Sequence, residues 1–208
     1  MERKKLIIIG ASGHGKVAAD IALKMNKWDE ILFLDDYSTK DNLLNFPIVG
    51  STKDILKYKE VADFFIGIGD NKTREGIFKQ LDALEVSIAT LIHPSAVIGI
   101  DVSISRGTAI MAGSIINPST KIGQCAIINT GSKVDHDSTI GAFVHLSPGV
   151  SVAGNVNVGK RTWLGIGSVV SNNIEISKDV VVGAGSLVIH DIVNSGTYVG
   201  TPAIEIKK

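Results

Sequence analysis

The strongest constraint on the fold is a six-residue hydrophobic period in the second half of the chain. From residue 98 to residue 188, every sixth position holds a branched aliphatic residue or leucine. A period of six fits neither an α-helix, whose apolar face recurs every 3.6 residues, nor an alternating strand. It is typical of a parallel β-helix, in which short strands alternate with tight turns and each sixth side chain points inward. The positions are Ile98, Ile104, Ile110, Ile116, Ile122, Ile128, Val134, Ile140, Leu146, Val152, Val158, Leu164, Val170, Ile176, Val182 and Val188.

Two neighbouring positions of the repeat favour the same architecture. The residue after each aliphatic is often Gly or another small residue, as at Gly99, Gly123 and Gly141, and we expect the backbone to turn sharply there. The fourth residue after each aliphatic is small or β-branched throughout, as at Thr108 and Ser132, which predicts a second, shallower row of inward side chains. Burial of the aliphatics contributes roughly 1.5–3 kcal/mol each before entropy is subtracted. The second half is therefore predicted to have a core of its own.

This repeat resembles the hexapeptide repeat of left-handed β-helix acyltransferases over residues 98–188. The resemblance implies a triangular prism built from three-strand coils. It also implies a homotrimer, with acyl-CoA held in the grooves between neighbouring prisms.

Composition limits the choice of partners and compartment. The 208 residues, 44% of them hydrophobic, suffice for one or two domains. Lys and Arg number 21, as do Asp and Glu, and no basic run is present, so nucleic acid is not an expected partner. The single Cys125 excludes an internal disulfide and fits a reducing compartment. No stretch approaches membrane-spanning or signal-peptide length, and we expect a soluble, cytoplasmic protein.

The first half opens with a pattern typical of nucleotide-binding domains. An apolar run over 5–9 predicts a strand, the glycine-rich stretch over 10–15 a turn, and residues 16–27 a helix. Such glycines bring amide groups close to an anion at the positive end of the helix. A second strand is expected over 31–34, ending in Asp35-Asp36, where Rossmann-like domains place an acid near a ribose. The glycine turn has a second interpretation, because such turns also serve only to join strand and helix.

The remainder of this half continues the alternation of strand and helix. We expect strands over 47–50, 62–68 and 86–91, and helices over 52–58 and 72–84. The result is a small α/β domain with a parallel sheet. It stops short of two mononucleotide halves, which favours a mononucleotide or nucleotide-sugar over NAD. The turn Gly67-Ile68-Gly69-Asp70-Asn71 could close the other side of that site, or be an ordinary connection with Asn71 as N-cap.

A histidine between two acids is the candidate for chemistry. Acyl transfer from a thioester needs a base that removes the acceptor's proton, and His136 suits that pH range. A carboxylate on its other ring nitrogen would fix the tautomer and raise the basicity, and either Asp135 or Asp137 could supply it. From the residues alone, a catalytic dyad and a solvated turn are equally good interpretations.

The order of motifs along nearly the whole chain resembles the bacterial sugar O- and N-acyltransferases. That family joins a Rossmann-like nucleotide-sugar-binding domain, here residues 1–92, to a left-handed β-helix with a C-terminal tail, here 93–208. The resemblance is strongest to the UDP-4-amino-sugar N-acetyltransferases of bacillosamine synthesis, and sialic acid O-acetyltransferases and GDP-perosamine N-acetyltransferases share much of the pattern. The matching motifs are Gly10-Ala11-Ser12-Gly13-His14-Gly15, Asp35-Asp36, His93-Pro94, Asn129-Thr130, His136-Asp137, His145 and Ala153-Gly154-Asn155.

The resemblance implies a role for each matching position. His136 corresponds to the general base, and Asp137 corresponds to the acid that raises its basicity. The bacillosamine enzymes have Glu at the position of Asp137. Gly154 corresponds to a main-chain donor near the thioester oxygen. The implied contacts to acetyl-CoA are His145, Ile166 and Ala184. The implied contacts to the nucleotide-sugar are Gly13, His14, Gly15, Asp35, Asp36 and Gly69, with Asn117 near the sugar. No metal is expected.

The predicted function is acetyl-CoA-dependent N-acetylation of a nucleotide-linked amino sugar of the UDP-4-amino-4,6-dideoxy type, in surface glycan biosynthesis. Transfer is expected to be direct, so Cys125 has no role. Three alternatives stay open: O-acetylation of a sugar such as sialic acid, a sugar-nucleotide-binding regulator without catalysis, and a zinc-dependent hydratase on the same fold. The H-x-x-x-x-H pair of that hydratase is absent, since His136 and His145 are nine residues apart.

Overall fold

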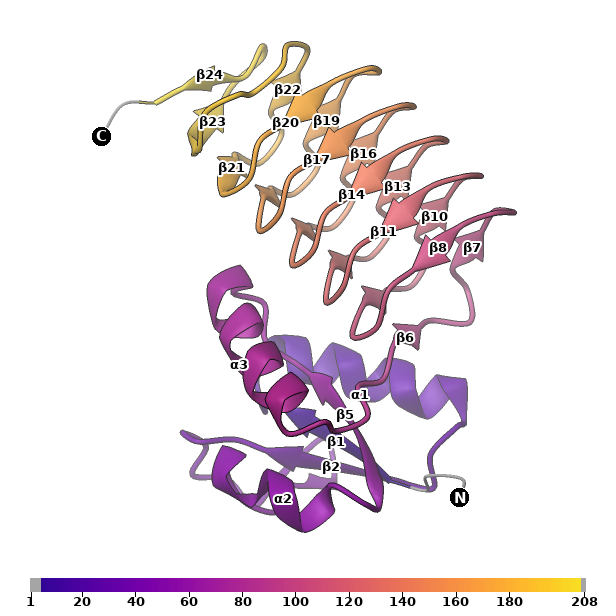
Figure 1. Ribbon diagram of the computed structural model, residues 1–208, viewed down its shortest axis with the longest axis vertical. Helices are drawn as coiled ribbons and strands as arrows, with labels where there is room; N and C mark the ends of the chain where they lie inside the picture. Colours follow the sequence, from indigo (N-terminus) through magenta and orange to yellow (C-terminus); the bar gives the residue numbers. More distant parts are fainter. Residues whose placement is uncertain (1–4, 207–208) are drawn as a thin grey trace. The chain divides into compact units, whose positions relative to one another are not determined.

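A computed structural model describes residues 5–206 and divides the chain into two compact units (Figure 1). The division falls between Pro94 and Ser95, two residues beyond the boundary expected from the sequence. No helix among the described residues is long and apolar enough to cross a bilayer.

The first unit is built on a three-stranded parallel sheet of order β2-β1-β5. The strands are β1 (Lys5–Ile9), β2 (Glu30–Leu34) and β5 (Ala62–Ile66). Single parallel bridges at Ile48 and Ile88 extend the sheet on its two sides. Residues 6–9 of the central strand are buried, which explains their uniformly apolar character. The α/β fold and parallel sheet expected from the sequence are confirmed, although the strand expected over 86–91 is reduced to that bridge and β6.

Three helices and short elements complete this unit. They are α1 (Gly13–Met25), β3 (Asn42–Leu43), β4 (Phe46–Pro47), the 3₁₀ turn η1 (Thr52–Asp54), α2 (Ile55–Tyr58), α3 (Asn71–Ala83) and β6 (Leu91–Ile92). Helix α1 begins three residues earlier than expected, so Gly13, His14 and Gly15 form its first turn and only residues 10–12 form the connection. Gly15 is required by packing, because a Cβ atom there would lie 2.0 Å from the carbonyl oxygen of Gly10.

The second unit is a parallel β-helix in which three hexads of the sequence make one coil. Each strand pairs with the strand three hexads further on, as in Ile116 with Val134 and Val134 with Val152. The first wall contains β7 (Val97–Ile98), β10 (Ile115–Ile116), β13 (Lys133–Val134), β16 (Ser151–Val152), β19 (Val169–Val170) and β22 (Leu187–Val188). The second wall contains β8 (Ser103–Ile104), β11 (Lys121–Ile122), β14 (Thr139–Ile140), β17 (Asn157–Val158) and β20 (Glu175–Ile176). The third wall includes β9 (Ala109–Ile110), β12 (Ile127–Ile128), β15 (His145–Leu146), β18 (Trp163–Leu164), β21 (Val180–Val182), β23 (Gly196–Val199) and β24 (Ile204–Glu205).

Both inward rows expected from the repeat are confirmed. Every aliphatic of the six-residue series is buried except Ile98 and Ile104 in the first coil. The shallower row is buried from Thr108 onward, and most of its hydroxyls donate to carbonyl oxygens of the next coil. Examples are Ser132 to Ser147 at 2.9 Å and Thr162 to Ser177 at 2.8 Å. These bonds avoid the cost of unpaired buried hydroxyls, although the hydroxyl of Ser168 has no partner among the described residues.

The position of the sharp turn differs from the expectation. The backbone adopts positive φ at the third residue after each aliphatic from Ile98 to Val182, not at the first. The small residue directly after the aliphatic has a packing role instead: a Cβ atom at Gly123 would lie 2.5 Å from the amide nitrogen of Ala142 in the next coil. Between the third and first walls every positive-φ residue is glycine, and this row is called the glycine edge: Gly113, Gly131, Gly149, Gly167 and Gly185.

Candidate active site

His136 and Asp137 lie at the corner between the first and second walls, directly after β13. Asp137 takes the positive-φ position, with φ of 57°, a conformation that Asp tolerates better than most residues. Its Oδ2 lies 2.8 Å from His136 Nδ1, so the side chain, one methylene shorter than Glu, reaches the ring. The bond from Asp137, and then the charge of Asp135, raise the pKa of His136 above its usual value. In the neutral tautomer that this bond favours, Nδ1 carries the proton and Nε2 presents a lone pair.

The imidazole of His136 lies against Gly154, one coil further on. A Cβ atom at residue 154 would lie 2.7 Å from both Cε1 and Nε2 of the ring. The amide of Gly154 donates to no other residue in the described part of the chain. The imidazole side chain is 58% exposed. An exposed base thus lies against a buried glycine whose amide the described residues do not use.

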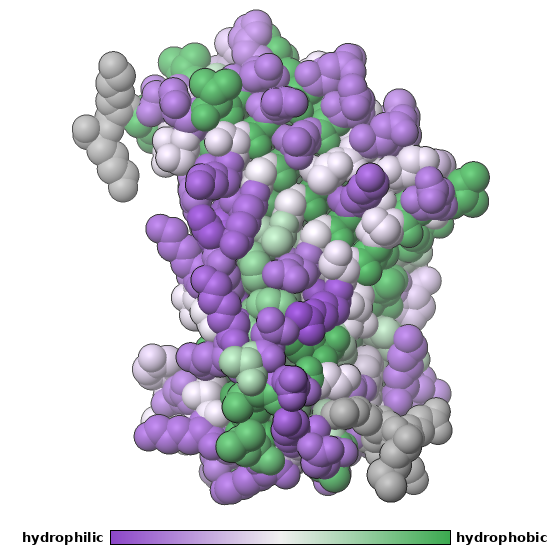
Figure 2. Space-filling view, in the orientation of Figure 1, coloured by the Kyte–Doolittle hydropathy of each residue, from purple (hydrophilic) through white to green (hydrophobic). Residues whose placement is uncertain are grey.

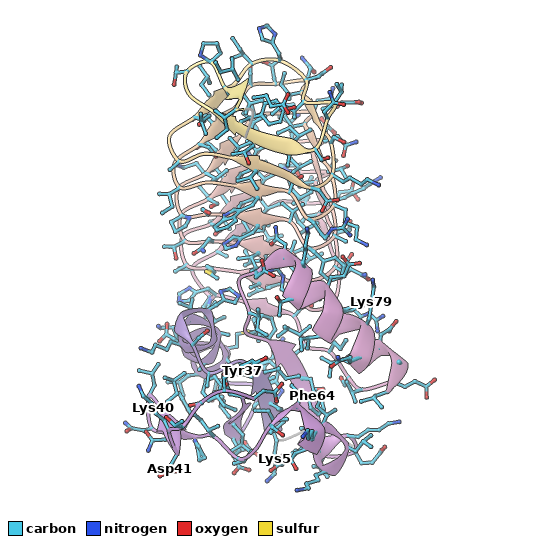
Figure 3. All side chains as sticks on the ribbon, turned by 90° about the vertical axis from the view of Figure 1, so that its left-hand side faces the viewer. Lys5, Tyr37, Lys40, Asp41, Phe64 and Lys79 are labelled. Atoms are coloured by element: carbon cyan, nitrogen blue, oxygen red, sulfur yellow. The ribbon has the colours of Figure 1, made fainter. Side chains whose placement is uncertain are left out.

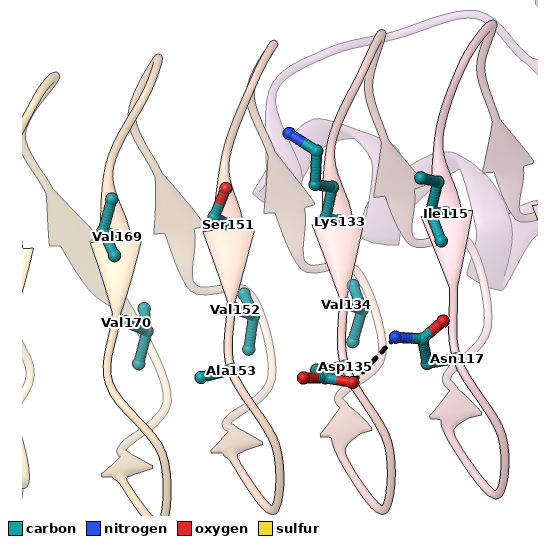
Figure 4. Close-up of a pocket in the computed structure, with 10 residues that line it drawn as sticks. All are labelled: Ile115, Asn117, Lys133, Val134, Asp135, Ser151, Val152, Ala153, Val169 and Val170. Atoms are coloured by element: carbon teal, nitrogen blue, oxygen red, sulfur yellow. Dashed lines mark hydrogen bonds between the residues drawn. The ribbon is translucent and has the colours of Figure 1, made fainter.

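Asp135 connects this corner to a groove on the first wall. Its Oδ1 accepts hydrogen bonds from Asn117 Nδ2 at 2.7 Å and from the His136 amide at 2.8 Å (Figure 4). These two bonds, the first above all, lower the pKa of Asp135. The groove has a volume of about 330 Å³ and is lined by Ile115, Asn117, Lys133, Val134, Asp135, Ser151, Val152, Ala153, Val169 and Val170. Asn117, expected near the sugar, is therefore hydrogen-bonded to Asp135, the residue before the candidate base.

A second groove, of about 430 Å³, runs over the third wall and the first residues of the turns that follow its strands. It brings together His145, Ile166 and Ala184, the three residues expected to contact acetyl-CoA. The other lining residues are Asn129, Ser147, Pro148, Trp163, Gly165, Val181, Val182 and Gly183. His145 stacks on Trp163, with ring centroids 5.6 Å apart and planes 7° from parallel. The lining is mostly apolar, and Figure 2 shows apolar residues reaching the surface of the β-helix between polar ones.

The two histidines are not brought into one site by a single chain. His136 lies at the corner between the first and second walls, whereas His145 belongs to β15 of the third wall. In the described structure His136 makes no hydrogen bond or ring contact with His145. Within one chain, His145 lines the second groove and His136 lies at a different corner of the coil.

Helices α1 and α3 of the first unit begin differently. Asp70, rather than the expected Asn71, caps α3, and its Oδ1 accepts from the Thr73 amide at 2.8 Å. The N-cap of α1, Ser12, makes no side-chain capping bond, and the first turn of α1 has no acidic residue. No side-chain cap and no acidic residue therefore offset the positive end of the α1 dipole, which favours an anion there.

The glycines of this unit divide into two groups. Gly10, Gly15 and Gly67 are explained by packing, since a Cβ atom on any of them would come within 3.0 Å of a neighbouring atom. A Cβ atom on Gly13 or Gly69 would meet nothing within 4 Å. The protein's own packing does not require glycine at these two positions, which leaves space beside the α1 N-terminus and after β5.

The two aspartates after β2 bind the protein's own backbone. Asp35 accepts from the amides of Ala11 at 2.7 Å, Tyr37 at 2.8 Å and Ser38 at 2.7 Å, while the Tyr37 side chain stays exposed (Figure 3). Burial alone would raise the pKa of Asp35, but these three amides outweigh it and lower that pKa. Asp36 accepts from the Thr52 amide at 2.7 Å. Both carboxylates fix the loops around the strand ends, and their contact with a ribose stays a prediction.

Two residues of the second groove were given no role from the sequence. Trp163 stacks on His145, and Asn129 Nδ2 lies 3.3 Å from His145 Nε2. The repeat contained a signal for the tryptophan, because three hexads make one coil and Trp163 follows His145 by that interval. For Asn129 the sequence indicates membership of a motif but no specific contact.

Known proteins are similar to this chain in both of its units. The family model described as the PglD N-terminal domain matches residues 5–81. A UDP-N-acetylbacillosamine N-acetyltransferase from Bacillus subtilis (strain 168) is 35% identical over 111 residues. This match covers 51% of this chain and 51% of that relative, about half of its length. The acetyltransferase domain of PglB from Neisseria gonorrhoeae FA1090, solved with acetyl coenzyme A, is 34% identical over 98% of this chain and all of that one, with a TM-score of 0.95. PerB from Caulobacter crescentus, solved with CoA and GDP-perosamine, is 35% identical over 98% of this chain and 97% of that one, with a TM-score of 0.92.

Proposed function

Since the chain belongs to the bacterial sugar acyltransferases that join a nucleotide-sugar-binding domain to a left-handed β-helix, we propose that it transfers the acetyl group of acetyl-CoA to the amine of a nucleotide-linked amino sugar. The observation that carries this proposal is the His136 imidazole, held by Asp137 on one nitrogen and lying against Gly154 with the other. The names of the Bacillus subtilis and Caulobacter crescentus relatives support an amino-sugar acceptor. The acceptor class that we propose is a UDP-linked 4-amino-4,6-dideoxy sugar destined for a surface glycan.

In the proposed reaction His136 acts as the general base. Its Nε2 takes a proton from the acceptor amine, whose nitrogen attacks the thioester carbon. The amide of Gly154 donates to the developing oxyanion. The C–S bond breaks, and His136 passes the proton to the departing sulfur, so that CoA leaves as the thiol. No acyl-enzyme forms. Cys125 is fully buried and lies outside both grooves, in keeping with this direct transfer.

We propose that acetyl-CoA occupies the groove over the third wall and extends from it across the neighbouring glycine edge. The apolar lining suits the pantetheine chain, and the stacked pair of His145 and Trp163 forms one side of the groove. Cβ atoms on Gly131, Gly149, Gly167 or Gly185 would meet nothing within 4 Å. At the other two corners the corresponding positive-φ positions hold larger residues, apart from Gly107 in the first coil. Because glycine has no side chain, nothing protrudes from this edge, and a long, thin ligand can lie against the backbone.

The working molecule in this proposal is a homotrimer. The outer row of the second wall is entirely polar: Ser103, Lys121, Thr139, Asn157 and Glu175. The first and third walls instead expose apolar side chains, among them Val97, Val169, Trp163 and Val181. Two apolar walls and one polar wall fit a ring in which each prism presents its first wall to one neighbour and its third wall to the other. Such packing would bring His136 of one chain to a groove that contains His145 of another.

We assign the nucleotide to the first unit, with its phosphates at the uncapped N-terminus of α1. Gly13 and Gly69 leave the space that a ligand close to the backbone needs. We also assign the protein to the cytoplasm, because Cys125 is a buried free thiol and disulfides are rare in a reducing compartment.

The proposed function is tested by release of CoA thiol from acetyl-CoA with a panel of UDP- and GDP-linked amino sugars and free sialic acid. We expect turnover with an amino-sugar nucleotide, and a loss of about 10²–10⁴-fold in His136→Ala. His190→Ala is the matched control, since this exposed histidine lines neither groove. Turnover with sialic acid alone would move the function to O-acetylation. Thermal stabilisation by a sugar nucleotide without any thiol release would identify a non-catalytic binder.

A further inference from the structure

Asp135 has one carboxylate oxygen that the protein does not use. Both of its hydrogen bonds, from Asn117 Nδ2 and from the His136 amide, go to Oδ1. Oδ2 accepts no hydrogen bond from any residue in the range 5–206. Figure 4 shows one oxygen directed at Asn117 and the other directed along the groove, toward the coil that carries Ala153. That coil also carries Gly154, against which the His136 ring lies.

The charge of this oxygen is not neutralised within the groove. Hydrogen bonding from Asn117 lowers the pKa of Asp135, so the carboxylate is ionised at neutral pH. Lys133 lines the same groove, but no ion pair joins it to Asp135 in the described structure. The other lining residues are uncharged. An anionic oxygen is thus held rigidly, beside a histidine, in a groove that otherwise offers mainly apolar contacts.

We propose that Asp135 binds the acceptor amine as its ammonium ion and so selects an amino sugar over the corresponding hydroxyl sugar. This inference rests on the proposed function and adds a specificity residue to it. An alkyl amine is largely protonated at neutral pH, and an ammonium ion gains Coulomb energy from a carboxylate that a neutral hydroxyl does not. Asn117 and the His136 amide hold Oδ1, which leaves Oδ2 to the ligand.

The ammonium ion reacts after it transfers one proton to His136 Nε2. The neutral amine then attacks the thioester carbon, the C–N bond forms and the C–S bond breaks. His136 releases the first proton to solvent, takes the second proton from the attacking nitrogen and passes it to the departing sulfur, so the products are the amide, CoA thiol and one proton in solvent. Asp135 remains ionised throughout, and its charge, which acts to raise the pKa of His136, also favours the histidinium.

The test is Asp135→Asn with a matched pair of ligands: the amino-sugar nucleotide and the same nucleotide with a hydroxyl in place of the amine. Asn keeps an oxygen that accepts from Asn117 and from the His136 amide, so mainly the charge is removed. Glu175→Gln is the control, because it removes one carboxylate from the polar second wall. Thermal unfolding establishes that both variants are folded.

We expect the KM for the amino-sugar nucleotide to rise on the order of 10-fold in Asp135→Asn, with the KM for acetyl-CoA unchanged. The inhibition constant of the hydroxyl analogue should change less than twofold. Equally weaker binding of the amino-sugar nucleotide and of the hydroxyl analogue would overturn the inference, as would a fall in kcat at unchanged KM. If the wild type acetylates no amine while it binds the hydroxyl analogue, the proposed function fails. If the wild type is active and Asp135→Asn matches it, only this inference fails.

Discussion

Replacement of Gly154 by Ala tests whether the position of the His136 ring controls the reaction. The added Cβ atom would lie 2.7 Å from Cε1 and Nε2, whereas ordinary contacts begin near 3.4 Å, so the ring must move by about 3.4 − 2.7 = 0.7 Å. Gly154 has no positive φ, so Ala fits the backbone, and the variant keeps the main-chain amide. Movement of the ring lengthens its 2.8 Å hydrogen bond to Asp137 and moves Nε2 away from the acceptor amine.

We expect kcat/KM for thiol release to fall about 10²-fold in Gly154→Ala, because displacement of a catalytic group by about 1 Å has an effect of that size. The melting temperature should change little, since the ring is exposed and can swing into solvent. Gly76→Ala is the control: a Cβ atom there meets nothing within 4 Å, and Ala in a helix adds about 0.5–1 kcal/mol of stability. Retention of activity within threefold in Gly154→Ala would refute the assignment of His136 as a base held over this glycine.

Three further substitutions test the remaining parts of the site. In Asp137→Asn the pKa of His136 should fall, because the bond that raises it is weakened, so the acid limb of the pH profile of kcat/KM moves to lower pH while the plateau drops. In Trp163→Ala the stack on His145 is lost, and the KM for acetyl-CoA should rise about 3- to 10-fold while that for the sugar nucleotide stays constant. Gly13→Asp places a carboxylate in the first turn of α1, where it should stabilise the helix by about 0.3–1 kcal/mol in urea unfolding and raise the KM for the sugar nucleotide. An unshifted pH profile in Asp137→Asn would contradict the role of Asp137. An unchanged KM for acetyl-CoA in Trp163→Ala would contradict the assignment of the second groove, and unchanged nucleotide binding in Gly13→Asp would contradict that of the α1 N-terminus.

The β-helix was predictable from sequence because its structure repeats with the sequence. An inward side chain every six residues is a direct consequence of coils with three short strands. The location of the turn was harder to predict. The sequence shows that the position after each aliphatic needs a small residue, but not whether a turn or close packing is the reason. Gly123 is small because the next coil passes over it, while the positive-φ position two residues later is held by Cys125.

The candidate site was predictable where the residues are neighbours in sequence or match a known motif. The bond between His136 and Asp137 lies within one turn, and the local chain brings the two side chains together. Contacts between coils were harder to foresee, as for Asn117 with Asp135. The backbone bonds of Asp35 could not be read from sequence, because they depend on where two distant loops pass the end of β2.

Because every coil has the same number of residues, the number of residues between two catalytic groups determines whether they lie side by side. His136 and Gly154 are separated by three hexads and therefore occupy the same place in successive coils. Deletion of a single residue between them would rotate every later side chain to a different face and separate the pair. Insertion of a whole coil beyond the two grooves would lengthen the prism and leave the pair in register. Natural variation in length is thus expected to arise in steps of whole coils, with the catalytic coil undisturbed.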